Sequence, residues 1–393
     1  MQFTVIGIPD KQDFHFAPDC LKVVGESKIF SGGKRHYQLV KHILPKDHKW
    51  IDITIPLKAV FDQYNSHEDI VVFASGDPLF FGFANTIKRE LPKANINLMP
   101  YFNSLQLLAH RMVLPYHDMI NVSLTGRPFH EFDRVLIERK EKIGLLTDKK
   151  NTPQNIAQRM LDYGYTNYEM IIGENMGGEN EKVQKLLITN AVKAKPSSLN
   201  CIILLKTGER KRYFGIPEKD INILEGRPKM MTKMPIRLLS LSFLDLYKRQ
   251  VMWDIGFCTG SVSIEAKMQF PHLKIHSFEK REESRALIQQ NTKKFGIPGI
   301  ESYIGDFFAM DLSEVAKPDA VFIGGHGGRL VEMLGIIKDN ILPGGIIVFN
   351  SVSKNSKDMF LEGVNKHGFK ILRETRIVVD DNNPIDTFAA ELI

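Results

Sequence analysis

Two acidic residues and a glycine turn mark the stretch of this sequence most able to do chemistry. In Val251-Met-Trp-Asp-Ile-Gly-Phe-Cys-Thr-Gly260, an apolar run ends in Asp254 and passes through a turn with Gly256 and Gly260 into a helical pattern. A strand, a glycine turn and a helix N-terminus offer backbone N–H groups to a nucleotide-like ligand. Glu279 ends the next predicted strand, where a carboxylate can accept both hydroxyls of a ribose. The alternative is an ordinary strand-to-helix turn.

The spacing differs from the dinucleotide fingerprint. Asp254-x-Gly-x-x-x-Gly places the acid before the turn, as in proteins that bind S-adenosylmethionine (SAM). Asp254 can bind the amino group of such a ligand, directly or through water, while the turn's N–H groups hold its carboxylate. Downstream, Asp306 could accept from an adenine amine and Phe307 offer its backbone N–H, although Asp306 could equally cap a helix.

A glycine-rich segment, Gly324-Gly-His-Gly-Gly328, follows the fourth predicted strand of this half. Open α/β sheets place reacting groups at such strand ends. Glycines let the backbone approach a bulky flat substrate, so Gly324, Gly325 and Gly327 are candidate substrate contacts. His326 is a candidate general acid or base, and the alternative is a loop histidine with no chemical task.

Two absences narrow the acceptor of a transferred methyl group. No Asn/Asp-Pro-Pro-Tyr/Phe segment follows that strand, which argues against methylation of a nucleobase amine. No cysteine pair stands at a strand end, which argues against covalent C5-pyrimidine methylation. We expect an intrinsically nucleophilic carbon or heteroatom that needs orientation and desolvation.

The first half carries a different motif, Ser75-Gly-Asp-Pro78, directly after the apolar run 70–74. Gly76 and Pro78 force a tight turn, and Asp77 can accept hydrogen bonds from the loop or from a ligand. Taken alone, the segment is also compatible with a simple type I turn.

Composition indicates the class of protein. With 393 residues, 43% of them hydrophobic and 25% charged, we expect two or three ordered domains. No long apolar run and no leader pattern are visible, so we expect a soluble cytoplasmic protein. Three scattered cysteines predict neither disulfides nor a metal site. The net charge of +6 suits either a solvated surface or a polyanionic ligand, nucleic acid being one candidate.

Strand and helix patterns alternate along the chain and predict α/β layering. The pattern fades between residues 211 and 234, so we place a domain boundary there, giving domains 1–210 and 211–393 with a connector. Basic residues are dense after Gly226 and include Arg227 and Lys229.

Residues 1–206 resemble the tetrapyrrole methylase family, in particular its cobalt-precorrin C5 branch. Several segments carry this resemblance: 75–82, 103–107, 123–128, 146–148, 152–153, 173–177 with Glu181, and 199–203. From Met231 the chain resembles a class I methyltransferase that acts at C15 with decarboxylation, through 231–237, 254–260, 305–306 and 324–328. In this order the halves look like the fused precorrin C5,15-methyltransferases (decarboxylating) of cobalamin biosynthesis.

The resemblance implies a two-lobed tetrapyrrole methylase fold followed by a doubly wound, Rossmann-like class I domain, each binding one SAM. The implied SAM contacts are, in the first domain, Pro9, Asp77, Phe80, Asn103 and Ser104, and in the second, Thr232, Asp254, Gly256, Phe257, Cys258, Thr259, Gly260, Glu279, Asp306 and Phe307. His326 and Arg127 are the candidate catalytic residues. A homo-oligomer is also expected.

The implied substrate is a ring of four pyrrole-derived units carrying many acetate and propionate groups. The negative charge of this substrate would be attracted by the basic connector, which contains Arg227 and Lys229. Its meso carbons are enamine-like and can attack the SAM methyl without a strong protein base. The conjugated ring can accept the electrons released by decarboxylation, so the protein need only shield and orient it.

Three positions depart from the family pattern. The opening glycine-rich loop is here Gly7-Ile-Pro-Asp-Lys, and the usual His-Gly-Arg is Thr125-Gly-Arg127, which removes a possible acid or base. Cys258 replaces a glycine in the SAM turn, so its Cβ would crowd the ligand's carboxyl group or the residue would need a positive φ. The rival hypothesis, suggested by the basic charge, is an RNA methyltransferase or a SAM-sensing RNA-binding protein.

Overall fold

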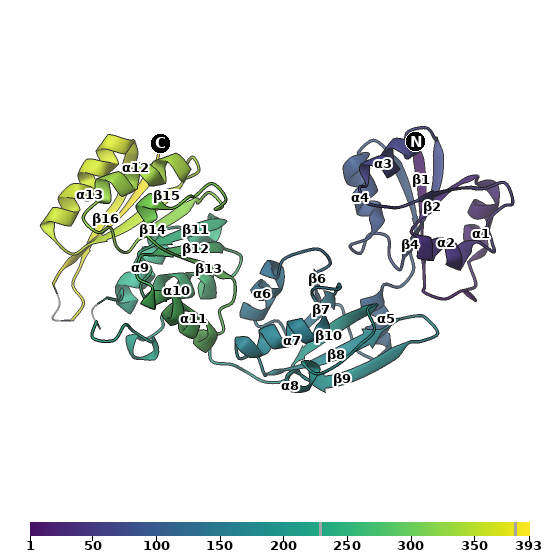
Figure 1. Cartoon of the computed structure of the whole chain (residues 1–393), viewed down its shortest axis with the longest axis horizontal. Coiled ribbons are helices and arrows are strands. Elements are labelled where there is room, and N and C mark those ends of the chain that lie inside the picture. The colour runs from purple at the N-terminus through teal and green to yellow at the C-terminus, as the bar shows by residue number, and fades with distance from the viewer. Residues whose placement is uncertain (228–229, 381–382) are drawn as a thin grey trace. The chain divides into compact units, whose positions relative to one another are not determined.

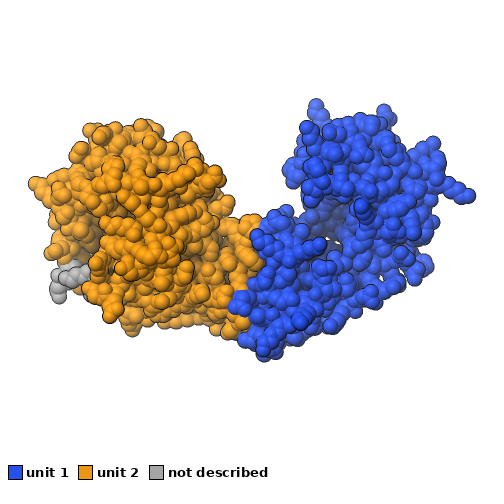
Figure 2. Space-filling view, in the orientation of Figure 1, with its two compact units in different colours: residues 1–127, 141–158, 168–207 blue, residues 128–140, 159–167, 208–393 orange. Residues whose placement is uncertain are grey.

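The computed structural model describes residues 1–227, 230–380 and 383–393. The chain forms two compact units (Figures 1 and 2). Unit 1 holds residues 1–127, 141–158 and 168–207, and unit 2 holds 128–140, 159–167 and 208–393. The two short segments that join unit 2 were not expected from the sequence. Within the described residues, no helix is both long and apolar enough to cross a bilayer.

Unit 1 contains two five-stranded sheets. The first is parallel throughout, in the order β3-β2-β4-β1-β5. The second has the order β6-β7-β10-β8-β9 and is parallel only between β6 and β7. Its strands are β1 Gln2–Ile8, β2 Ile29–Gly32, β3 Lys49–Asp52, β4 Asp69–Ser75, β5 Asn95–Met99, β6 Ile120–Ser123, β7 Lys142–Leu146, β8 Tyr168–Glu174, β9 Lys182–Leu187 and β10 Asn200–Lys206. The helices begun in this unit are α1 Pro18–Glu26, α2 Lys34–Val40, α3 Lys58–Tyr64, α4 Phe83–Glu90, α5 Ser104–Arg111, α7 Pro153–Asp162 and α8 Ile188–Ala191.

The paired central strands β1 and β4 are almost continuously apolar and buried, as strands covered on both faces should be. Their carboxyl ends approach each other closely. A Cβ built on Gly7 would lie 1.9 Å from the Gly76 carbonyl oxygen, so only glycine fits there. The Ser-Gly-Asp-Pro turn is thereby held against the end of β1.

Unit 2 contains one seven-stranded sheet in the order β13-β12-β11-β14-β15-β17-β16. The strands from β13 to β15 are parallel, and β17 runs antiparallel to both of its neighbours. Its strands are β11 Val251–Ile255, β12 Lys274–Glu279, β13 Ile300–Ile304, β14 Ala320–Ile323, β15 Ile346–Ser351, β16 Phe369–Ile377 and β17 Ile385–Leu392. Its helices are α6 His130–Ile137, η1 Glu218–Asp220, α9 Met234–Phe243, η2 Leu246–Lys248, α10 Ser261–Gln269, α11 Glu283–Phe295, η3 Phe307–Ala309, α12 Leu330–Asn340 and α13 Lys354–His367.

Alternating strand residues face two separate cores, as the period of two requires. Trp253 and Ile255 pack with α12 and α13 on one face of the sheet. Met252 packs with α9 and α10 on the other. Helices therefore cover both faces of the sheet (Figure 1). The predicted α/β fold, with a tetrapyrrole methylase half and a doubly wound half, is confirmed.

The connector predicted between residues 211 and 234 is tied to unit 2. Ile216 is fully buried, and the backbone N–H groups of Gly215 and Ile216 donate to the two oxygens of Glu265 on α10 at 3.0 and 2.8 Å. Arg237, also fully buried, forms an ion pair with Glu265 and donates to the Ile216 carbonyl. This network satisfies two buried charges and anchors the segment before the site.

Candidate functional site

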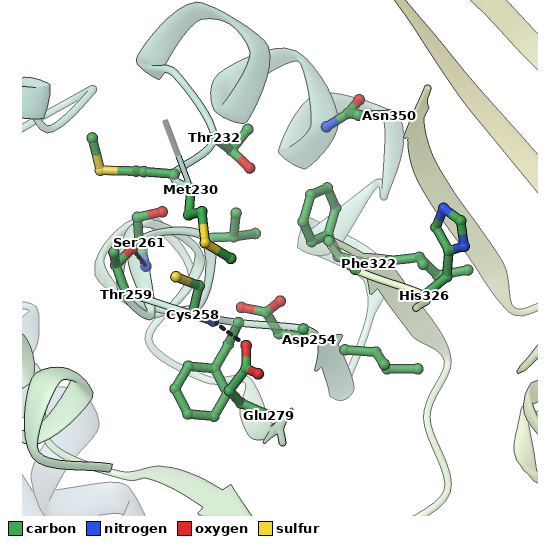
Figure 3. A pocket seen from close by; sticks show the side chains of 18 of the residues that line it. Met230, Thr232, Asp254, Cys258, Thr259, Ser261, Glu279, Phe322, His326 and Asn350 are labelled. Atoms are coloured by element: carbon green, nitrogen blue, oxygen red, sulfur yellow. Dashed lines mark hydrogen bonds between the residues drawn. The ribbon is translucent and has the colours of Figure 1, made fainter. Parts of the chain in front are cut away.

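A cavity of about 1200 Å³ opens in unit 2 at the carboxyl ends of the parallel strands. This edge of an open α/β sheet is where ligands bind. Figure 3 shows Asp254, Cys258 and Glu279 on one side of the cavity, with His326 and Asn350 on another. The predicted site residues that line it are Thr232, Asp254, Gly256, Phe257, Cys258, Thr259, Glu279, Asp306, Phe307, Gly324, Gly325, His326 and Gly327.

Asp254 is the last polar group of the central strand β11 and is fully buried. Ser263, on the first turns of α10, donates its backbone N–H and its hydroxyl to Oδ2 of Asp254. The other oxygen, Oδ1, is buried and has no hydrogen-bond partner among the described residues. Burial raises the pKa of Asp254 to about 7, against the lowering effect of Ser263. A cationic ligand group at Oδ1 would favour the ionised form of the carboxylate and would supply the missing hydrogen-bond donor.

Glu279 organises the turn from the neighbouring strand end. Its Oε2 accepts the Cys258 backbone N–H at 3.1 Å. Its Oε1 accepts the backbone N–H groups of Lys280 and Arg281 and an Arg281 guanidinium N–H at 2.9 Å. Oε2 has a single hydrogen-bond donor among the residues that the structure describes, so it keeps capacity for a further donor such as a hydroxyl.

The turn between β11 and α10 has the left-handed backbone that its glycines predict, and Cys258 shares it. Gly256 and Gly260 have φ values of +79° and +74°. A Cβ on Gly256 would lie 2.5 Å from the Gly325 N, so this turn packs directly against the glycine-rich loop. Cys258 also has a positive φ of 48°, as expected if a side chain replaces glycine there. Burial raises the pKa of its thiol to about 11, so it is not a thiolate at neutral pH.

His326 lies in the glycine-rich loop after β14 and lines the cavity. Its Nδ1 accepts the Gly328 backbone N–H at 3.2 Å, which leaves the ring proton on Nε2. Its ring meets Phe349 edge-on at 5.8 Å, and burial lowers its pKa, so the neutral ring dominates at pH 7. The geometry suits a hydrogen-bond donor to a bound ligand.

Asp306 caps η3, accepting the Phe308 backbone N–H at 3.2 Å. It also lies 3.7 Å from the Arg329 guanidinium, which stacks on the Phe308 ring. The capping role weighed in the sequence is therefore present, and the carboxylate still borders the cavity beside Phe307.

Two predicted positions among the described residues do not line the cavity. Gly260 is the N-cap of α10 and packs on Ile288. Arg227 is exposed, and Lys229 lies outside the described residues. Other groups of the site were missed: Ser263, Arg281 and Asn350. Only Asn350 carried a usable signal, because it stands near the carboxyl end of β15, as Asp254 does on β11.

A second cavity, of about 420 Å³, lies within unit 1. Of the residues predicted there, Pro9, Phe80, Asn103 and Ser104 line it. Asn103 also caps α5, accepting the Gln106 N–H at 2.9 Å. Asp77 is not part of the lining and accepts the Leu79 N–H at 2.8 Å, which closes its own turn. Arg127 is exposed and its guanidinium lies 5.4 Å from the ring of Phe81, a lining residue.

The doubly wound sheet of unit 2, with acids at two adjacent strand ends around a glycine turn, defines a class I methyltransferase domain. Two family models match the chain: "Tetrapyrrole (Corrin/Porphyrin) Methylases" over residues 4–191 and "Precorrin methyltransferase domain" over residues 226–390. The chain belongs to the precorrin methyltransferase family, whose members are enzymes, and it carries both of the domains found in its fused, decarboxylating C5,15 members.

Three relatives illustrate this membership. A Sinorhizobium precorrin-6Y C(5,15)-methyltransferase [decarboxylating] is 28% identical over 94% of this chain and 89% of its own length. A Salmonella typhimurium cobalt-precorrin-6B C(15)-methyltransferase (decarboxylating) is 35% identical over 34% of this chain and 68% of its own length. A cobalt-precorrin-7 C(5)-methyltransferase of that species is 26% identical over 51% of this chain and 98% of its own length. The comparisons give no support to the RNA hypothesis.

Proposed function

We propose that this chain methylates precorrin-6Y (precorrin-6B) at C5 and C15 and decarboxylates a ring acetate, with SAM as the methyl donor in both halves. Residues 1–210 carry the C5 activity, and residues 211–393 carry the C15 and decarboxylating activity. The names of the relatives support this division, because the separate C5 and C15 enzymes match opposite halves of the chain. They also support an order in which the C15 step comes first.

The observation that carries the proposal is the buried, half-satisfied carboxylate of Asp254 beside a large cavity. A buried polar atom without a partner costs free energy unless a ligand supplies one. The SAM ammonium group fits Oδ1, the ribose fits Glu279, and the adenine fits the edge near Asp306 and Phe307. When bound, SAM supplies an electrophilic methyl group to the acceptor carbon.

The chain's own groups orient and shield the substrate. Gly324, Gly325 and Gly327 leave room for a flat ring against the backbone, and His326 Nε2 donates to it. No strong base is needed, because the acceptor carbon is itself nucleophilic. Exclusion of water favours loss of carbon dioxide from the ring acetate. The electrons of the broken C–C bond pass into the conjugated ring, and a proton then replaces the carboxyl group. The exposed Arg227, together with the positive charge of Lys229, attracts the polyanionic substrate. Cytoplasmic location and a homo-oligomeric state remain predictions, and light scattering would test the latter.

Calorimetry with SAM tests the site. Asp254→Ala in the full chain should weaken SAM binding at one of two sites by about 1–3 kcal/mol, the cost of an unpaired polar partner. Asp77→Ala, in unit 1, should leave that site unchanged. If Asp254→Ala binds SAM at each of the two sites with the same affinity as the wild type, the assignment is contradicted.

A further inference from the structure

The cavity of unit 1 contains a cluster of polar side chains that the sequence did not single out. Arg35 and His36, at the start of α2, both reach Ser75 at the end of β4. The Ser75 Oγ lies 3.0 Å from Arg35 Nη2 and 2.9 Å from His36 Nε2. All three residues line the cavity.

The hydrogen bonds determine which atom donates. His36 Nδ1 accepts the Gly33 backbone N–H at 3.2 Å, so the neutral ring carries its proton on Nε2 and donates it to Ser75. Burial, aided by Arg35, lowers the pKa of His36 to about 4, which keeps the ring neutral at pH 7. The Ser75 oxygen thus accepts two hydrogen bonds, and its own hydrogen remains free to donate.

Arg35 also keeps donors to spare. Its Nη1 lies 3.6 Å from Asp10 Oδ2, and its side chain is 45% exposed. A guanidinium has five N–H donors, and these contacts engage two of its nitrogens. Arg35 and Ser75 together therefore present a cation and a hydroxyl donor at the exposed part of the cavity, a pair suited to a carboxylate.

The surroundings favour a carboxylate on a large flat molecule. Phe81 and Phe102 line the same cavity and are 42% and 48% exposed, so two apolar rings are exposed beside the same opening. An apolar body with charged groups at its edge would cover these rings and reach Arg35. A SAM carboxylate is the other possible source of the same chemistry.

We propose that Arg35 and Ser75 bind a peripheral carboxylate of the precorrin ring in unit 1, with His36 as the positioning residue that orients the Ser75 hydroxyl. This inference rests on the proposed function, and it names the subsite that discriminates a carboxylate-bearing ring from a neutral one. Loss of the subsite should weaken precorrin binding without affecting SAM.

The test titrates the full-length protein with precorrin-7 in the absence of SAM, following the absorbance of the ring, and measures SAM affinity separately by calorimetry. Arg35→Gln should raise the precorrin Kd about tenfold and Ser75→Ala about threefold, with unchanged SAM affinity at both sites. Lys34→Gln is the matched control, because it removes a neighbouring positive charge that does not line the cavity and should leave both affinities unchanged. Thermal unfolding confirms that each variant is folded.

His36 is tested by rescue. His36→Ala should weaken precorrin binding as Ser75→Ala does, while His36→Gln, which retains an N–H donor near Ser75, should restore it. Weakened SAM binding with unchanged precorrin binding would assign the carboxylate to SAM and overturn the proposal. Unchanged affinities, or parallel losses for both ligands, would also overturn it. A wild-type protein that binds SAM but no precorrin would instead contradict the proposed function itself.

Discussion

Asp254 shows how a single residue links fold and function. It ends a buried strand, and within the described part of the chain only one of its oxygens has a hydrogen-bond partner. Its folded-state pKa of about 7 lies above the ordinary value of 3.8, so the protonated form is favoured in the folded chain. The stabilisation from this proton is complete below about pH 4 and is lost as the pH rises through 7.

Proton release on SAM binding follows from this shift. Because the ammonium group binds the ionised carboxylate, affinity at this site should fall about tenfold from pH 8 to pH 6. At pH 6, binding should release close to one proton. Calorimetry in buffers of different ionisation enthalpy measures that proton, and Asp254→Asn should abolish it. A pH-independent affinity would show that Asp254 does not face the ligand's cation.

Cys258 alters the backbone of the SAM turn and takes no part in the reaction. Its positive φ is costly for a residue with a side chain, and its raised pKa makes the thiol unreactive. Cys258→Gly should therefore leave C15 methylation intact or improve it, with the free energy of unfolding changed by no more than about 1 kcal/mol. Loss of C15 methylation in a folded Cys258→Gly protein would refute this.

At the scale of elements, the turn after β11 and the loop after β14 form one structure. Gly256→Ala would put a methyl group 2.5 Å from the Gly325 N at a φ of +79°. We expect a loss of about 2 kcal/mol or more in stability and a matching loss of SAM affinity in unit 2. Gly208→Ala, where nothing lies within 4 Å, is the control. Urea unfolding measures the stability of each variant, and calorimetry measures its SAM affinity. If Gly256→Ala and Gly208→Ala behave alike, the turn and the loop do not depend on each other.

Helix α6 belongs to unit 2 although it lies within the first family match. Ile137, 2% exposed, packs with Ile264, Met268 and Phe295 of that unit. Ile137→Ala should destabilise unit 2 by about 2–4 kcal/mol, whereas Val113→Ala, at an exposed site, should not. Urea unfolding followed by Trp253 fluorescence in a Trp50→Phe background measures both. If Ile137→Ala leaves the free energy of unfolding of unit 2 unchanged, α6 does not stabilise that unit.

Local patterns predicted the parts of the fold that depend on neighbouring residues. The apolar run 70–74 lies within β4, and the apolar run that ends in Asp254 lies within β11, because a continuous apolar run is a local signal. Asp254, Gly256 and Glu279 were found in the same way. Ser263 and Arg281 were missed, because their roles depend on which carboxylate the fold brings beside them. The grouping of residues 128–140 with unit 2 has no local signal at all.

For the whole molecule, we expect that the two candidate sites, one in each unit, perform two activities that single substitutions can separate. Unit 2 is built from three separate stretches of the chain, and this decides how the two activities can be tested. Fragments cut near residue 210 would separate α6 from the rest of unit 2, so single-site variants of the full chain are the better instrument. Each variant should lower the rate of one activity and leave the rate of the other unchanged.

The most direct test is the mass of the products formed by wild type and by Asp254→Asn with SAM. From precorrin-6B, offered with and without cobalt, the wild type should give a product that has gained two methyl groups and lost one carbon dioxide. At a SAM concentration well below the wild-type Kd of the unit 2 site, Asp254→Asn should convert precorrin-6B about 5- to 150-fold more slowly, the equivalent of about 1–3 kcal/mol, yet add one methyl group to precorrin-7 at the wild-type rate. A wild type that neither methylates nor decarboxylates precorrin-6B would contradict the account. An Asp254→Asn protein that converts precorrin-6B at the wild-type rate, or that no longer methylates precorrin-7, would contradict it as well.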